Sequence, residues 1–248
     1  MTEAEVKEHA TASKTYAPWL DQRNFNDWSN AELARNITRG VRSRDPNAIV
    51  GESGTQDPWQ YHSGRNWWWM SRAYTGLVAY RGLQTVEQES YNPDLVRYSW
   101  AGYGKPNPLN RVAFYNILSS HDKGIAIFTA RCHINPDFTL PEPGHDVRAV
   151  LIELQRGIGQ MLVSARTSKD PVFILQSPSS LFGAYITGLD AMAATSRLAA
   201  VRLIKDLGIR FQNISWEQLV DGQLNKVEAR VLILPANVAL SAAEAQAI

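Results

Sequence analysis

Carboxylates that could do acid–base chemistry stand at the carboxyl end of one predicted strand and in the loop after the next. Glu52 lies in a compact polar turn, Gly51 to Gln56, that follows a short apolar run. A carboxylate there could bind a hydroxyl of a ligand or take part in catalysis, or it could simply cap a helix or pair with an arginine. Glu89 and Glu87 lie in a polar segment after the next apolar run, where solvated loop glutamates are the ordinary alternative. We predict Glu52 and Glu89 as catalytic candidates and Gln56 as a substrate contact of the same turn.

Aromatic side chains form the second group of candidate site residues. The chain has eight tryptophans, of which residues 59, 67, 68 and 69 lie close together. Sugar C–H faces pack well on aromatic rings, so Trp59 and Trp100, at or just after predicted strand ends, are predicted to contact a carbohydrate. Three consecutive tryptophans cannot all face one way on a helix, and at least one of residues 67–69 is expected in the core. Arg81 ends another predicted strand and could bind a sugar oxygen or form an ordinary salt bridge.

The other reactive residue types show no pattern typical of a metal or cofactor site. His62 and His121 are isolated from other residues at metal-ligand spacing. Cys132 is the single cysteine, which excludes an internal disulfide and fits a reducing compartment. Gly157-x-Gly159 lacks the third glycine of a dinucleotide fingerprint and follows no predicted strand. We therefore expect no metal and no cofactor.

Short apolar runs separated by helical patterns position the candidate residues. Val96, Tyr98 and Trp100 alternate with Arg97 and Ser99, as in a half-buried strand. An amphipathic helical run and a β-branched run follow, and strand, helix and strand in this order indicate a βαβ unit with parallel strands. Four such strands are predicted before residue 130, near residues 48–54, 76–81, 95–101 and 124–129. The candidate residues would then lie at the carboxyl ends of parallel strands, where barrel enzymes carry their chemistry.

A second α/β segment is predicted after Asp170-Pro171, and we place the domain boundary between residues 1–168 and 169–248. Gly208 is suited to end a helix near residues 189–206. Ser241 with Glu244 is a capping box that begins a further helix. The apolar runs of this segment predict three strands, at 172–175, 210–214 and 230–234.

Two helices of the first segment are predicted from their apolar spacing. Ser29 with Glu32 resembles a capping box, and Leu33, Ile37 and Val41 then form an apolar stripe. A longer amphipathic helix is predicted over residues 145–165, with Gly157 and Gly159 as an interruption.

Composition excludes several classes of protein. The chain has 248 residues, 44% hydrophobic and 20% charged, which is typical of a globular protein. The net charge of +1 and the lack of a Lys/Arg-rich run argue against nucleic-acid binding. The longest apolar runs are too short to span a membrane, and the polar N-terminus is unlike a secretory signal. We predict a cytoplasmic protein with no membrane partner.

The residues also resemble a known family. The closing segment, VEARVLILPANVALSAAEAQAI, and the segment DPVFILQSPSS resemble the amidotransferase-like trimerisation domain of glycoside hydrolase family 42 β-galactosidases. Upstream, Gly124–Phe128 resembles the eighth strand of the family's (β/α)₈ barrel, and the helix around QRGIG resembles its last helix. The resemblance begins near residue 16. It implies the second half of a TIM barrel followed by a partial flavodoxin-like, amidotransferase-like domain.

The resemblance implies hydrolysis of O-glycosidic bonds by paired carboxylates. The family's acid/base glutamate follows an asparagine after the fourth strand, and no Asn-Glu pair occurs in this chain. The family's nucleophile ends the seventh strand, where this chain reads Tyr98-Ser99-Trp100-Ala101-Gly102. We therefore expect a fragment of a β-galactosidase-like hydrolase that is inactive by itself, whose full-length form is a trimer acting on a carbohydrate. The alternatives are a non-catalytic carbohydrate-binding or scaffold protein on a degenerate barrel, and an open α/β enzyme.

Overall fold

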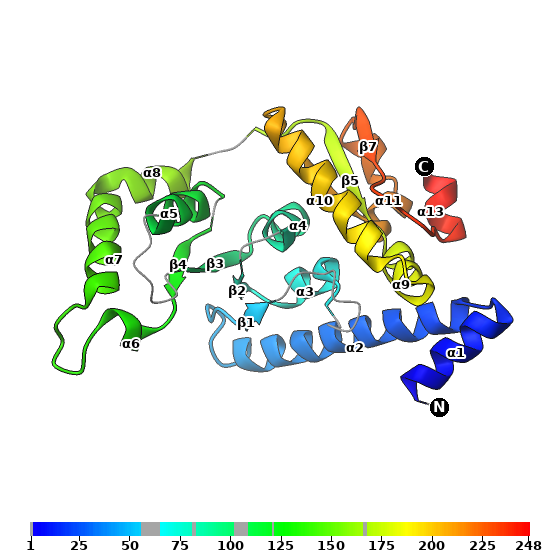
Figure 1. Ribbon diagram of the computed structural model, residues 1–248, viewed down its shortest axis with the longest axis horizontal. Coiled ribbons are helices and arrows are strands. Elements are labelled where there is room, and N and C mark those ends of the chain that lie inside the picture. The colour runs from blue at the N-terminus through cyan, green and yellow to red at the C-terminus, as the bar shows by residue number, and fades with distance from the viewer. Residues whose placement is uncertain (1, 56–64, 81–82, 102–108, 121, 166–167) are drawn as a thin grey trace.

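The chain forms two parallel β-sheets connected and covered by helices (Figure 1). This computed structural model describes residues 2–55, 65–80, 83–101, 109–120, 122–165 and 168–248. The mixed α/β class with parallel strands, predicted from the alternation of apolar runs and helical patterns, is confirmed.

The first sheet has its strands in sequential order, β1 (Gly51–Thr55), β2 (Gly76–Ala79), β3 (Val96–Ala101) and β4 (Gly124–Ile127). All three pairings between neighbouring strands are parallel. A helix follows each of the first three strands: α3 (Trp67–Ala73), α4 (Leu83–Tyr91) and α5 (Leu109–Ser119). Each predicted strand of this segment is therefore present, because sequential βα units with short apolar strands build a parallel sheet.

The second sheet has the order β6-β5-β7, with β5 (Val172–Gln176) between β6 (Gln212–Ser215) and β7 (Val231–Ile233). One face of it packs on α10 (Asp190–Asp206) through Ile174, Val201 and Ile204. The other face packs around Leu219 of α11 (Trp216–Val220). The predicted strands and the helix near 189–206 are confirmed. The remaining helices here are α9 (Pro178–Thr187), α12 (Gln223–Lys226) and α13 (Ala242–Ala247), the last beginning with the predicted Ser241–Glu244 capping box.

The predicted helix over residues 145–165 is present as three consecutive pieces. They are α7 (Glu142–Glu153), a π-helical turn (Leu154–Ile158) and α8 (Gly159–Ser164). Gly157, at φ 115°, gives the break that the glycines predicted. A short helix, α6 (Ala130–His133), precedes these pieces.

The strand register defines two faces of the first sheet. Ala79, Ser99 and Ile125 lie side by side on the face that the helices cover, together with the buried Leu77 and Ala101. Val78, Tyr98 and Trp100 point to the opposite face and are only half-buried. On β3 the side chains of Arg97 and Ser99 are buried, whereas those of Tyr98 and Trp100 are only half-buried. Hydrophobicity alone would indicate the opposite. The first sheet therefore has one covered face and one open, largely apolar face.

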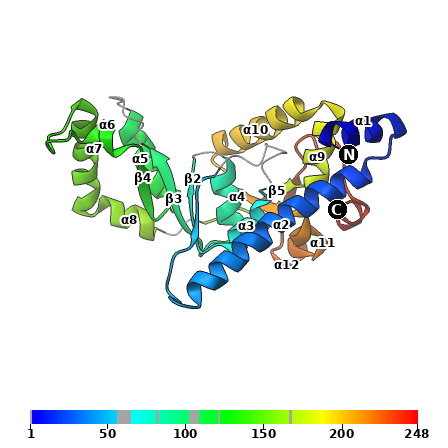
Figure 2. The same cartoon turned by 90° about the horizontal axis from the view of Figure 1, so that it is seen from below.

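The N-terminal helices differ from the prediction. After α1 (Glu3–Ser13), a single helix, α2 (Ala17–Arg42), runs along the first sheet and reaches α9 of the second segment (Figures 1 and 2). The predicted cap at Ser29 is wrong, because this residue lies in the middle of α2. The stripe of Leu33, Ile37 and Val41 is exposed by 61%, 48% and 43%, whereas small residues on another side of α2 are buried: Ala31, Ala34 and Thr38.

The two segments are packed together through α4. Val86 of α4 joins the apolar cluster of β5 and α10, and the backbone N–H of Asn213 in β6 donates to the hydroxyl of Ser90 at 2.9 Å. Glu87 of α4 forms a buried ion pair with Arg197 of α10. The helix that follows β2 of the first sheet is thus also part of the core of the second.

Candidate functional site

An aromatic pair lies where β3 and β4 end. The rings of Trp100 and Phe128 meet edge to face, with their centroids 5.7 Å apart and an interplanar angle of 89°. Trp100 is half-buried on the open face of the sheet, and Phe128 is 45% exposed. The register places Trp100 beside Ala126, so small neighbours leave room for the indole. This pair gives the carboxyl edge of the sheet an exposed aromatic surface.

Polar groups follow the aromatic pair directly along the chain. Thr129 is the N-cap of α6, and its hydroxyl lies 3.2 Å from the sulfur of Cys132. Hydrogen bonds from Thr129 lower the pKa of the Cys132 thiol. His133 is buried, with its Nε2 3.4 Å from the carbonyl oxygen of Phe128. These side chains position the end of β4 relative to α6, and they also give the edge its hydroxyl, thiol and imidazole groups.

Glu52 is held in an ion pair on β1. It is the second residue of a five-residue strand, and its register with Leu77 places it on the helix-covered side of the sheet. Arg65 Nε donates to Glu52 Oε1 at 2.8 Å, which is the arginine pairing considered as its alternative role. Burial raises the pKa of Tyr74, and the nearby charge of Glu52 raises it further. The prediction that Glu52 lies at the carboxyl end of its strand is therefore wrong, because the strand begins at Gly51 and continues to Thr55.

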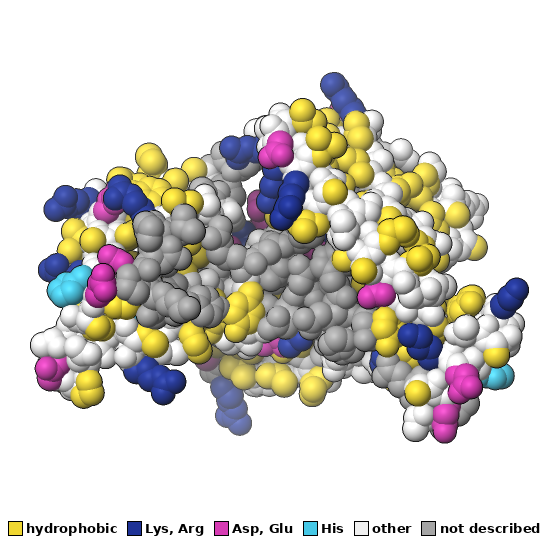
Figure 3. Space-filling view, in the orientation of Figure 1, with side chains coloured by type: hydrophobic (Ala, Val, Ile, Leu, Met, Phe, Trp, Pro, Cys, Tyr) yellow, Lys and Arg dark blue, Asp and Glu magenta, His cyan; other side chains and the backbone are white. Residues whose placement is uncertain are grey.

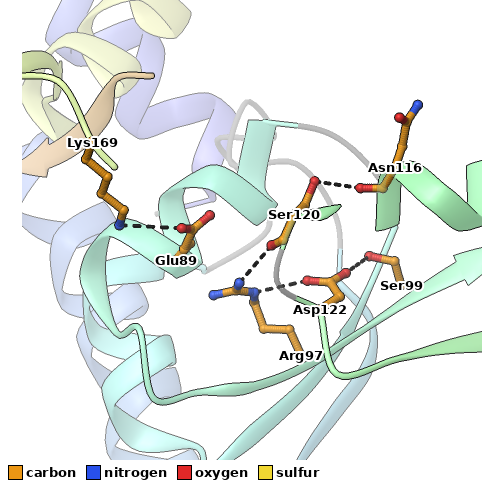
Figure 4. A network of polar contacts seen from close by, with 7 residues as sticks. All are labelled: Glu89, Arg97, Ser99, Asn116, Ser120, Asp122 and Lys169. Atoms are coloured by element: carbon orange, nitrogen blue, oxygen red, sulfur yellow. Dashed lines mark hydrogen bonds and ion pairs between the residues drawn. The ribbon is translucent and has the colours of Figure 1, made fainter. Parts of the chain in front are cut away.

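Glu89 lies within α4 rather than in a loop, so its predicted placement is also wrong, and the same holds for Glu87. Lys169 Nζ lies 3.5 Å from Glu89 Oε1 (Figure 4). The charge of Glu89 acts on Asp122, which stands just before β4. The carboxylate of Glu89 therefore lies toward the amino edge of the sheet, away from the aromatic pair.

The amino edge carries a buried polar network around Asp122 (Figure 4). Arg97 Nε donates to Asp122 Oδ1 at 3.1 Å, and the Ser99 hydroxyl donates to Oδ2 at 2.5 Å. Arg97 also donates to the carbonyl oxygen of Ser120 at 3.1 Å. Burial raises the pKa of Asp122, while the bonds from Ser99 and Arg97 oppose that shift. Residues at this edge of parallel βα units usually serve stability, and we assign this role to the network.

Three predicted site residues, Gln56, Trp59 and Arg81, lie outside the described residues. Of the predicted contacts, the structure brings Trp100 to the carboxyl edge and does not bring Glu52 and Glu89 there. Phe128 was not among the predicted site residues, although its position directly after the half-buried strand Gly124–Ile127 marks it as a strand end.

Comparison with models of known protein families and with curated protein sequences gave no match to the chain. Within the described ranges, no three or more His, Cys, Asp and Glu side chains are grouped so that they could hold a metal ion. No helix in the part of the chain that the structure describes is long and apolar enough to cross a membrane.

Proposed function

We propose that this chain carries the carbohydrate-binding surface of a β-galactosidase-like protein of the glycoside hydrolase family 42 type. In this proposal the first sheet is half of a (β/α)₈ barrel, and the second sheet belongs to a flavodoxin-like accessory domain. The observation that carries the proposal is the Trp100–Phe128 pair, which is half-exposed at the carboxyl edge of a parallel sheet.

The strand order and the half-buried face of the first sheet support the barrel assignment. Its strands follow one another in sequential order, as in a (β/α)₈ barrel. Barrel strands alternate between an inner and an outer face, and the inner face is filled with side chains from all strands. Here the face with Val78, Tyr98 and Trp100 is half-buried, and the stripe of Leu33, Ile37 and Val41 on α2 is exposed. Further βα units would cover both surfaces.

Carbohydrate is the ligand class that suits the carboxyl edge best. The C–H faces of a pyranose pack on aromatic rings, and sugar hydroxyls bond to polar groups around such rings. Trp100 and Phe128 supply the rings, and Thr129 supplies a hydroxyl at the same edge.

The positions of the carboxylates support a role in binding carbohydrate rather than in hydrolysing it. Glycosidases place two carboxylates on either side of the scissile bond. The described strand ends, at residues 79–80, 100–101 and 127–133, contain no Asp or Glu. Glu52 is neutralised by Arg65, and Glu89 lies toward the other edge beside Lys169. In this proposal the chain contributes sugar contacts, and its described strand ends supply no catalytic carboxylate pair.

A fluorescence titration combined with a turnover assay tests this proposal. We expect lactose to change the tryptophan emission in a saturable way, and p-nitrophenyl β-galactoside to remain unhydrolysed. The emission change should disappear in Trp100→Phe and persist in Trp28→Phe, because Trp28 lies on α2 away from the site. Turnover that Glu52→Gln abolishes would overturn the binding-only role, and an absent emission change would overturn carbohydrate binding.

A further inference from the structure

A small pocket lies in the second segment, far from the aromatic pair along the chain. It opens where β5 ends and where the chain leaves β7, and it has a volume of about 300 Å³ including its open mouth. The pocket has room for a water-sized group. The pocket is lined mainly by Gln176, Ser177, Ser180, Arg197, Ala236 and Asn237.

The pocket occupies the place in the second sheet where parallel α/β proteins bind ligands. β5 lies between β6 and β7, so the chain leaves β5 toward one side of the sheet and later returns on its other side. The crevice outside the carboxyl ends of the strands at such a reversal is the usual ligand site of open α/β sheets. Helix α9, ten residues long, begins at this crevice and directs its N-terminus toward it. The first turn of a helix favours a negative charge.

Two polar groups that line the pocket lack hydrogen-bond partners among the described residues. The Ser180 hydroxyl is one, and only 7% of this residue is exposed. The side-chain nitrogen of Asn237 is the other. Ser177 is already engaged, because its hydroxyl oxygen caps α9 by accepting from the N–H of Ser180. Buried polar groups in folded proteins are nearly always satisfied, so two unsatisfied groups around one pocket indicate a bound group.

The residues around the pocket favour a ligand that accepts hydrogen bonds. Its lining contains no aspartate or glutamate. Arg197 is held in place by bonds from Nη2 to Glu87 and, at 2.9 Å, to Asn213. The hydroxyl of Ser180 and the side-chain amide of Asn237 offer hydrogen-bond donors, and the dipole of α9 adds a favourable field for negative charge.

We propose that this pocket binds a small oxyanion, that is, phosphate or the carboxylate of a small organic acid. One oxygen of the anion accepts from the Ser180 hydroxyl and the Asn237 amide. The rest of the anion lies in the open mouth at the N-terminus of α9. This site is independent of the carbohydrate-binding proposal.

Calorimetric titration of the full chain with inorganic phosphate, and separately with acetate, tests the proposal at fixed ionic strength in sodium chloride. We expect saturable binding of at least one of these anions, and the tighter of the two identifies the natural class. Ser180→Ala should weaken binding about tenfold or more, as expected for a lost hydrogen bond to a charged group.

Ser179→Ala is the matched control, because Ser179 lies in the same turn of α9 but does not line the pocket. It should bind the anion as the unmodified chain does. If Ser180→Ala fails to fold, Asn237→Asp replaces it, since its carboxylate should abolish anion binding with little change in shape. The proposal is overturned if neither anion binds saturably, or if the folded pocket variant binds as tightly as the unmodified chain.

Discussion

Arg197 of α10 and Glu87 of α4 form an ion pair, 110 residues apart in sequence, that joins the two parallel sheets. Their side chains are 3% and 0% exposed, and Asn213 accepts a further bond from Arg197. Together with Val86 and the bond from Asn213 to Ser90, this pair makes α4 a shared element of both cores. The two segments should therefore unfold together.

Removing one partner of this pair should destabilise the whole chain. Arg197→Met leaves Glu87 as a buried charge without its main partner, and we expect a loss of about 3–5 kcal/mol in the free energy of unfolding. The double variant with Glu87→Gln should recover part of this loss. Urea unfolding followed by circular dichroism measures both. The exposed pair of Lys226 and Asp221 is the control, because Asp221→Asn should change stability by less than about 1 kcal/mol. An equally small effect at Arg197 would contradict the shared core.

Two glycines should respond in opposite directions to alanine. A methyl group on Gly51 would lie 1.7 Å from the carbonyl oxygen of Gly76, so Gly51→Ala forces β1 away from β2. We expect a loss of about 1–3 kcal/mol in stability. Gly40 lies in α2 with nothing within 4 Å of such a methyl group, so Gly40→Ala should stabilise the chain by about 0.5–1 kcal/mol. Thermal melts of the two variants compare them, and a stabilising Gly51→Ala would show that the β1–β2 contact is not close.

Glu217 should make stability depend on pH. Burial raises the pKa of Glu217 from 4.5 to about 7, and the charge of Glu244 adds to the shift. The folded state then holds the proton of Glu217 more tightly than the unfolded state does. The contribution of this proton to the free energy of unfolding is therefore fully present below pH 4.5 and is lost as the pH rises through about 7. Glu217→Gln should remove this loss and raise stability at pH 8 by about 1–3 kcal/mol relative to pH 4.5. Equal effects of the substitution at both pH values would contradict the raised pKa.

The two sides of α2 should differ sharply in their tolerance of polar residues. Leu33 is 61% exposed, and Leu33→Gln should change the free energy of unfolding by no more than about 0.5 kcal/mol. Ala34, 1% exposed, packs in the cluster of Trp67 and Met70, and Ala34→Gln should cost about 2 kcal/mol or more. Chemical denaturation of the two variants measures both changes in the free energy of unfolding. A large loss in Leu33→Gln would show that the apolar stripe of α2 is buried in solution.

Exposed apolar side chains also lie along α10 (Figure 3). Met192, Leu198 and Leu203 of this helix are 51%, 40% and 62% exposed. Sequence periodicity reports which residues of a helix share a side, and it does not report which side is covered. For this reason the spacing of Leu33, Ile37 and Val41 predicted a shared side of α2 but could not show that this side is exposed. Burial of Ala31 and Ala34 depends on the close approach of α3, which only the tertiary structure shows.

The sheets were predictable because each strand contains or directly follows a short local apolar run, such as the run at residues 48–50 before β1. The placement of the carboxylates was not, because it depends on partners distant in sequence. Arg97 and Ser99 are buried on β3 only because Asp122, more than 20 residues later, satisfies them. Glu87 and Glu89 lie in a helix whose sequence, QTVEQESY, has the polarity of a loop and is stabilised by packing on β6. Trp100 was predictable because its position depends only on where β3 ends.

Calorimetric titration of lactose into the chain tests the carbohydrate-binding claim most directly. We expect saturable binding, at least about tenfold weaker binding in Trp100→Ala and in Phe128→Ala, and unchanged binding in Trp28→Ala, whose exposed ring lies on α2. Lactose binding that survives both substitutions at the edge, or no binding by the unmodified chain, would contradict a sugar site at the Trp100–Phe128 pair.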